Sequence, residues 1–154
     1  MRLMRRKIDD FLKEWKENED RLPLIVKGAR QIGKTASIMQ FANDNYKNVV
    51  AINFVLQQKF KSIFDDGYDV DSIVRNITLI DPSIELEPGN TIFFFDEMQD
   101  CPVCATSFKA FKIDGRYDVV CSGSLMGINY QEIESNSVGY KEDYTCLLYT
   151  SPSP

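Results

Sequence analysis

Histidine is absent from the 154-residue sequence, and its absence narrows the chemistry open to the chain. Histidine is the most frequent general acid or base of enzymes and a common metal ligand. Without it, His-based nucleophilic catalysis and His-ligated metal sites are excluded for these residues. Carboxylates, hydroxyls and lysine remain as the catalytic groups.

Long hydrophobic runs are also absent. No apolar stretch reaches the roughly 18 residues that mark a candidate membrane span. The N-terminus carries positive charges but not the apolar segment of a signal peptide. With 44% hydrophobic and 27% charged residues, the composition is typical of one soluble domain with a sizeable core. We therefore expect a cytoplasmic protein with no membrane partner.

The chain lacks an excess of positive charge. Its 18 basic and 23 acidic side chains give a net charge of -5, which argues against a broad nucleic-acid interface. Residues 1–7 are locally basic, and we interpret them as a solvated helix start rather than a nucleic-acid-binding arm. An interaction with nucleic acid is therefore only weakly supported.

Cysteine is sparse, at four residues. Cys101 and Cys104 have the C-x-x-C spacing of a zinc half-site or a redox pair. No histidine accompanies them, and Cys121 and Cys146 do not form a second closely spaced pair. We therefore interpret all four as incidental thiols.

Residues 28–35 match the spacing G-x-x-x-x-G-K-[ST] of a phosphate-binding loop at every fixed position. The two glycines let backbone N–H groups turn toward a phosphate chain, Lys34 would reach the β- and γ-phosphates, and the Thr35 hydroxyl would ligate Mg²⁺. A buried strand is predicted before the loop, at 22–27, and helical apolar spacing follows it. A plain glycine turn would explain the glycines but not the Lys and Thr that follow. The predicted nucleotide-binding residues are Gly28, Ala29, Arg30, Gln31, Ile32, Gly33, Lys34 and Thr35.

Apolar periodicity divides the rest of the chain into alternating helices and strands. Strands are predicted at 49–56, 91–95 and 117–121, and the first of these reads as covered on both faces. Helices are predicted at 8–15, at 70–80 with Asp69 as the cap, and at 103–112. This alternation predicts an α/β fold with a parallel sheet and flanking helices, in which ligands bind at the carboxyl ends of the strands.

Acidic and small polar side chains follow the later strands. Asp96 and Glu97 end the most apolar strand, and we assign Asp96 to the metal and Glu97 to the attacking water as general base. The alternative is an acidic strand end that faces solvent. Ser122 and Ser124 end the next strand, either as a sensor hydroxyl between water and γ-phosphate or as turn formers. Gln99 would orient water or shape the loop, and spacing leaves both roles open.

Three segments, 24–35, 94–99 and 114–127, together closely resemble prokaryotic AAA-type ATPases, in which an N-terminal ATPase domain precedes a C-terminal domain of unknown function. The resemblance covers residues 6 to about 145. It implies a P-loop NTPase fold of the additional-strand class, with strand order 5-1-4-3-2, that binds ATP and Mg²⁺. It implies Lys34 and Thr35 as the Walker A pair, Asp96 and Glu97 as Walker B, and Ser122 at a sensor position. The implied catalytic residues are Glu97, Lys34 and Ser122, and the implied metal ligands are Thr35 and Asp96.

The resemblance stops near residue 145. Family members continue into a fifth strand, a lid and the C-terminal domain, whereas residues 146–154 match a transposase-end sequencing adapter translated in one frame. We therefore expect residues 1–145 to form an N-terminal helix plus a partial ATPase domain that lacks the fifth strand and the lid, and residues 146–154 to be a non-native tail. The arginine finger and second sensor would then be missing, so that hydrolysis by this fragment would be slow or absent. An ATP-dependent switch or interaction module with little hydrolysis is the alternative function, and its protein partner is unknown.

Overall fold

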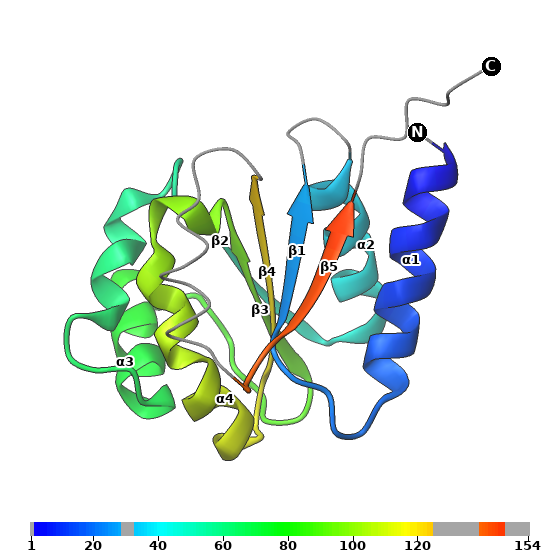
Figure 1. Ribbon diagram of the computed structural model, residues 1–154. Coiled ribbons are helices and arrows are strands. Elements are labelled where there is room, and N and C mark those ends of the chain that lie inside the picture. The colour runs from blue at the N-terminus through cyan, green and yellow to red at the C-terminus, as the bar shows by residue number, and fades with distance from the viewer. Residues whose placement is uncertain (1, 29–32, 125–138, 147–154) are drawn as a thin grey trace.

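The computed structural model describes residues 2–28, 33–124 and 139–146, which form one parallel sheet between two layers of helices (Figure 1). The elements, in chain order, are α1 (Arg2–Glu17), β1 (Leu24–Gly28), α2 (Lys34–Asn45), β2 (Asn48–Asn53), η1 (Gln58–Phe64), α3 (Val70–Ile80), β3 (Thr91–Asp96), η2 (Met98–Asp100), η3 (Pro102–Ser107), α4 (Phe108–Asp114), β4 (Asp118–Ser124) and β5 (Glu142–Cys146). Among the described residues, no helix has the length and hydrophobicity needed to cross a membrane.

The sheet has the strand order β2-β3-β4-β1-β5, and each neighbouring pair is parallel. This confirms the predicted α/β class and the predicted order 5-1-4-3-2. The register aligns the carboxyl ends of the strands. Gly28 lies opposite Ser124 on β4, and Asn53 on β2 lies opposite Asp96 on β3. The polar residues that follow the strands therefore lie along one edge of the sheet.

A fifth strand is present, so the expectation that the chain lacks one was wrong. β5 pairs with β1 from Leu24 opposite Glu142 to Gly28 opposite Cys146. The exposed residues Asp143 and Thr145 alternate with less exposed ones, and the ring of Tyr144 packs 4.4 Å from the ring of Phe11 on α1, centroid to centroid. This pairing provides hydrogen-bond partners for the backbone groups on the edge of β1 that faces away from β4. Cys146 ends the strand, whereas residues 147–154 lie outside the described residues, and their interpretation as a non-native tail stays a prediction.

One face of the sheet is covered by α1 and α2. Ile8, Leu12 and Trp15 on α1 are buried, at the i, i+4 and i+7 positions of an amphipathic helix. They pack with apolar side chains of α2 and the sheet in a cluster that contains Leu24, Val26, Ile38, Phe41, Ala42, Ile92, Phe94 and Val120. This confirms the predicted first helix, which begins at Arg2 rather than at residue 8.

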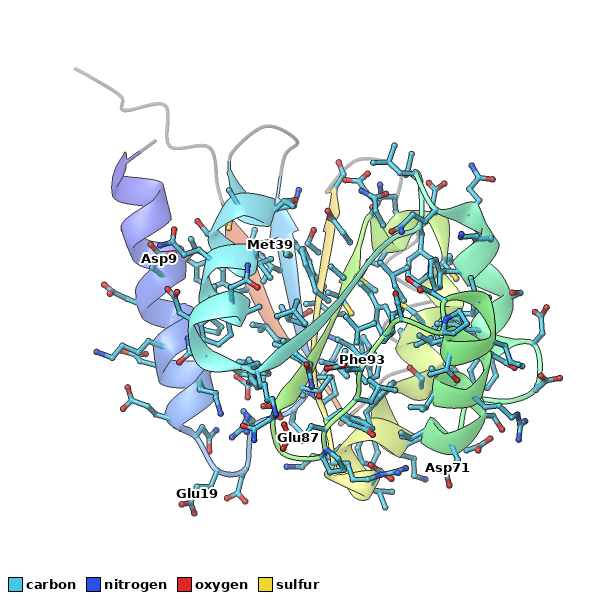
Figure 2. The ribbon with its side chains drawn as sticks, turned by 180° about the vertical axis from the view of Figure 1, so that it is seen from behind. Asp9, Glu19, Met39, Asp71, Glu87 and Phe93 are labelled. Carbon is cyan, nitrogen blue, oxygen red and sulfur yellow. The ribbon has the colours of Figure 1, made fainter. Side chains whose placement is uncertain are left out.

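The opposite face is covered by α3, α4 and the 3₁₀ segments. Alternate residues of β3 point to this side, and Figure 2 shows Phe93 among the side chains that fill the interior while Asp71 lies at the surface. Asp69 caps α3 as predicted, because its carboxylate accepts a hydrogen bond from the Ser72 N–H at 3.0 Å. The helix predicted at 103–112 is a 3₁₀ segment, η3, followed by the short α4.

Strand β2 is shorter and more exposed than predicted. It lies at the edge of the sheet, where Ala51 is exposed, so it is not covered on both faces as the sequence suggested. It ends at Asn53, whose side-chain oxygen accepts hydrogen bonds from the N–H groups of Val55 and Leu56 at 2.9 and 3.0 Å. That local turn competes with strand pairing and stops the strand.

Candidate functional site

A cavity of about 620 Å³ lies at the carboxyl edge of the sheet. It is lined by residues from the start of α2, the end of β2 and the end of β3: Gly33, Lys34, Thr35, Ala36, Asn53, Val55, Leu56 and Glu97. The described end of the predicted phosphate loop, residues 33–35, and Glu97 at the acidic strand end therefore lie at one cavity. Ligand sites of parallel α/β sheets lie at this edge.

The start of α2 has the geometry of an anion site. Gly33 is the N-cap in the left-handed conformation, at φ 77°, which costs glycine little. Lys34 and Thr35 are the first two residues of the helix, whose N-terminus carries a partial positive charge. Gly28 ends β1. The other predicted nucleotide-binding residues, Ala29, Arg30, Gln31 and Ile32, lie outside the described residues.

Asp96 on β3 connects the start of α2 to β4. Its Oδ2 accepts a hydrogen bond from Thr35 Oγ1 at 3.2 Å, and its Oδ1 accepts from Ser122 Oγ at 2.6 Å and from the Glu97 N–H at 2.9 Å. The carboxylate is buried, with a residue exposure of 7%. Three donors fix its orientation, and the Thr35 hydroxyl lies within hydrogen-bond reach of one of its oxygens.

The oxygens of Asp96 and Thr35 suit Mg²⁺. In nucleotide sites this ion is held by one or two protein oxygens together with phosphate oxygens and water, rather than by an all-protein cage. Consistent with that, no group of three or more Cys, Asp or Glu residues suited to a metal occurs in the described part of the chain. The residues present therefore fit Mg²⁺ bound together with a nucleotide.

Glu97 adopts an unusual backbone conformation. Its φ of 57° and ψ of 48° are left-handed, and among the described residues no other non-glycine residue has a positive φ. This conformation costs a non-glycine residue roughly 1–2 kcal/mol. Strained residues of this kind concentrate at functional sites. Here the turn puts Glu97 on the wall of the cavity that Lys34 and Thr35 also line.

Ser122 and Ser124 make different contacts. Ser122 is fully buried, and its hydroxyl donates to Asp96, the residue assigned to the metal. Ser124 donates its backbone N–H to Gln99 Oε1 at 3.3 Å. The sensor role of Ser122, between water and γ-phosphate, stays a prediction. Its contact with Asp96 gives it a second role, the orientation of that carboxylate.

Sequence reasoning missed Asn53 and left Gln99 open. Asn53 lines the cavity from the end of β2, opposite Asp96, but the strand was predicted to continue past it. Its signal is a polar residue at the end of an apolar run, the same signal that identified Asp96. Gln99 Nε2 donates to Glu97 Oε2 at 2.7 Å, a contact that no sequence spacing specifies.

The cysteines are buried and free in the structure. Burial raises the pKa of Cys101 to about 12 and that of Cys146 to about 11, and burial together with Cys121 raises the pKa of Cys104 well above its usual range. Thiols with raised pKa values are poor nucleophiles and poor metal ligands at neutral pH. Their environment agrees with the interpretation as incidental thiols.

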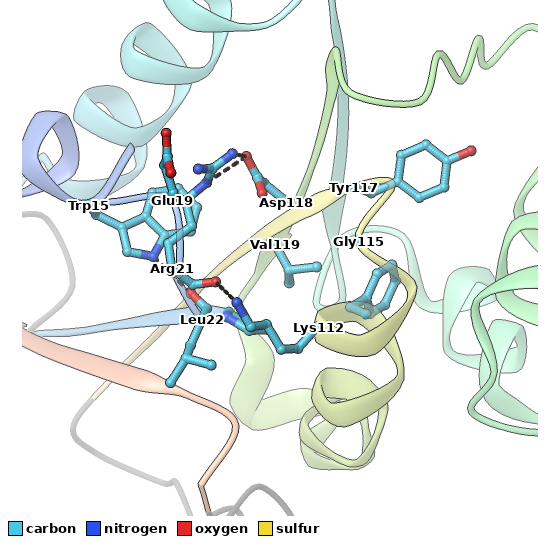
Figure 3. Close-up of a pocket in the computed structure, with 11 residues that line it drawn as sticks. Trp15, Glu19, Arg21, Leu22, Lys112, Gly115, Tyr117, Asp118 and Val119 are labelled. Atoms are coloured by element: carbon cyan, nitrogen blue, oxygen red, sulfur yellow. Dashed lines mark hydrogen bonds and ion pairs between the residues drawn. The ribbon is translucent and has the colours of Figure 1, made fainter. Parts of the chain in front are cut away.

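A second, smaller pocket of about 110 Å³ lies at the opposite edge of the sheet, between the segment before β1 and the start of β4 (Figure 3). None of the predicted site residues lines it. Arg21 forms an ion pair with Asp118 at 2.8 Å, and Lys112 Nζ donates to the Arg21 carbonyl at 3.1 Å. These contacts connect the segment before β1 to β4 and α4. We therefore interpret the pocket as structural.

The sequence matches a known family over most of its length. A family model described as an AAA domain matches residues 20–150. None of the curated protein sequences compared with the chain matches it significantly.

Several solved structures share the fold. PCH-2 of C. elegans superposes with a TM-score of 0.54 at 12% identity, over 92% of this chain and 42% of that one. The Holliday junction branch migration motor RuvB of Thermotoga maritima gives 0.53 at 14% identity, over 94% and 44%. A chain of Drosophila ORC bound to DNA gives 0.56 at 11% identity, over 95% and 93%. The chain thus spans less than half the length of the PCH-2 and RuvB chains, and at these identities the likeness concerns the fold alone.

Proposed function

Because the chain belongs to the AAA domain family, we propose that it binds ATP with Mg²⁺ at the carboxyl edge of its sheet and hydrolyses the ATP to ADP and phosphate. One observation carries the proposal. Lys34, Thr35 and Glu97 line one cavity, and Thr35 Oγ1 lies 3.2 Å from the buried Asp96 carboxylate. These are the groups that phosphoryl transfer needs, a cationic phosphate clamp, metal ligands and a base.

Each residue has a separate part in the proposed reaction. Lys34 and the N-terminus of α2 bind the phosphate chain, together with the predicted loop residues 28–33. Thr35 and Asp96 hold Mg²⁺, which offsets the charge on the phosphates. Ser122 keeps Asp96 in its orientation through their 2.6 Å hydrogen bond.

Glu97 acts on the nucleophile. Its carboxylate accepts a proton from the attacking water as the water oxygen bonds to the γ-phosphorus. The bond from that phosphorus to the β-phosphate oxygen breaks, and ADP carries away the electron pair. Removing a positioned general base costs about 10²- to 10⁴-fold in rate.

Two substitutions separate binding from chemistry. Lys34→Ala should abolish Mg-ATP binding measured by calorimetry, because the phosphate clamp is lost. Glu97→Gln should leave binding intact and reduce phosphate release by about 10²-fold or more. Lys13→Ala and Glu14→Gln make the same changes at exposed positions of α1 and should alter neither property. Normal turnover in both site variants would overturn the assignment.

The same measurements identify the alternative function. An ATP-dependent switch or interaction module would bind Mg-ATP through Lys34 yet release no phosphate in the wild type. Drosophila ORC is bound to DNA in its structure, and association with DNA is a separate hypothesis for this chain. The net charge of -5 does not favour it. If the chain leaves the electrophoretic mobility of duplex DNA unchanged at low salt, the hypothesis of DNA association is contradicted.

A further inference from the structure

The side-chain amide of Gln99 bridges the ends of two strands. Its Nε2 donates to Oε2 of Glu97 at 2.7 Å, and its Oε1 accepts from the backbone N–H of Ser124 at 3.3 Å. Glu97 directly follows β3, and Ser124 ends β4. The first contact is short, as expected for a donor to a carboxylate, and the second is longer and weaker.

These two contacts fix which way the amide points. If the amide were turned over, its NH₂ group would face the N–H of Ser124, and its oxygen would face the Glu97 carboxylate. In that flipped orientation two donors would face each other at Ser124, and two acceptors would face each other at Glu97. The Ser124 N–H therefore selects the orientation in which Gln99 donates to Glu97.

The direction of the Glu97 carboxylate is not fixed by the glutamate side chain itself. A glutamate side chain has several rotatable bonds, and ordering it costs conformational entropy. The left-handed backbone at φ 57° sends the side chain toward the cavity, and the hydrogen bond from Gln99 restrains the carboxylate at the end of it. A positioned group of this kind raises the rate of a reaction without strengthening substrate binding.

We propose that Gln99 is a positioning residue that holds the Glu97 carboxylate in its working direction by using the end of β4 as an anchor. This rests on the proposed role of Glu97 in ATP hydrolysis. Gln99 itself does not touch the substrate in this assignment. It acts through Glu97.

Two substitutions separate the contacts of Gln99. Gln99→Glu keeps an oxygen that can accept from the Ser124 N–H but cannot donate to Glu97, and it opposes two carboxylates. Gln99→Met keeps the length of the side chain and removes both contacts. We expect both to reduce kcat by about tenfold or more while the Kd for Mg-ATP changes by less than about twofold. Gln40→Glu makes the same charge change on the exposed face of α2 and should leave both values unaltered.

Double variants test whether Gln99 acts through Glu97. In a Glu97→Gln protein, Gln99→Glu or Gln99→Met should reduce the residual turnover no further. Additive losses in the double variants would overturn the proposal, since Gln99 would then act on its own. Full kcat in Gln99→Glu would also overturn it, because the contact with Ser124 alone would suffice.

A spectroscopic measurement tests the contact independently of turnover. In a ¹H–¹⁵N spectrum of the whole chain, the side-chain amide proton of Gln99 should lie downfield of the corresponding protons of Gln40. It should move back in Glu97→Ala, which removes the acceptor. An unshifted resonance in the wild type would overturn the positioning contact. A shifted resonance in a wild type that releases no phosphate would leave the contact standing and overturn the proposed hydrolysis instead.

Discussion

Ser122 on β4 donates a hydrogen bond to Oδ1 of Asp96 on β3 at 2.6 Å, and both side chains are buried. A hydrogen bond to a charged group contributes about 1.5–3 kcal/mol to stability. Ser122→Ala should therefore lower the free energy of unfolding by about that amount and weaken the Mg²⁺ dependence of nucleotide binding, because Asp96 loses a donor that orients it. Urea unfolding can be followed by the fluorescence of Trp15, the one tryptophan of the chain, which is buried.

Ser107 provides the matched control. It is also fully buried, and its hydroxyl donates to the Cys104 carbonyl at 2.6 Å, a neutral acceptor. Neither Ser107 nor Cys104 is among the residues that line the cavity. Ser107→Ala should cost only about 0.5–1.5 kcal/mol and leave the Mg²⁺ dependence unaltered. Equal effects of the two substitutions on Mg-nucleotide binding would contradict the role assigned to Ser122.

Tyr46 gives a prediction for alkaline pH. Its hydroxyl donates to Asp118, which also pairs with Arg21. Burial and the negative charge of Asp118 raise the pKa of Tyr46 well above its usual value of about 10. Above about pH 10 the unfolded chain releases the hydroxyl proton of Tyr46, while the folded chain keeps it. The free energy of unfolding therefore falls as pH rises, by up to about 1.4 kcal/mol per pH unit for this group.

The Tyr46→Phe variant lacks this titration. It should be less stable than the wild type at pH 8, because a hydrogen bond to a carboxylate is lost, and the difference should shrink above about pH 10. The free energy of unfolding measured from pH 8 to pH 11 checks this. Parallel curves for the two proteins would contradict the raised pKa of Tyr46.

Local patterns were sufficient to predict most of the fold. The glycine spacing of residues 28–35, the apolar periods of the helices and the Asp69 cap depend on neighbours within a few residues along the chain. The order of the sheet came from resemblance to a family, and the structure agrees with it. Polar residues at strand ends indicated the site because parallel strands bring their carboxyl ends to one edge.

Contacts between distant segments were not predictable in this way. Arg21 and Asp118 are 97 residues apart, and no sequence spacing specifies their ion pair. Gln99 reaches Ser124 across 25 residues, so its role became visible only with the geometry of η2 and β4. The fifth strand was missed because its five residues are mostly polar, as an edge strand can be, and because the expected tail begins within it.

Hydrogen exchange can test the fifth strand directly. The N–H of Glu142 donates to the Pro23 carbonyl at 2.9 Å, and a parallel ladder repeats such contacts at alternate residues. The amide of Tyr144 should thus face β1 and exchange at least about tenfold more slowly than those of Asp143 and Thr145, which face outward. On β3, which is paired on both sides, the consecutive amides of Phe93 and Phe94 should both be protected. Equal exchange along residues 142–146 would contradict the pairing.

Glu97 allows its backbone strain to be measured apart from its carboxylate. Glu97→Ala and Glu97→Gly both remove the side-chain contacts, but only glycine adopts φ 57° without a steric penalty. The relief of about 1–2 kcal/mol exceeds the extra conformational entropy that glycine loses on folding, which is about 0.5–1 kcal/mol. Glu97→Gly should therefore be more stable than Glu97→Ala by about 0.5–1 kcal/mol in urea unfolding.

The same pair of substitutions at Glu14 should have the opposite order. Glu14 is exposed within α1, where the backbone is helical and glycine is less favourable than alanine by about 1 kcal/mol. There the glycine variant should be the less stable of the two. If Glu97 showed this helix-like order as well, its left-handed conformation would be contradicted, and with it the geometry that directs its carboxylate into the cavity.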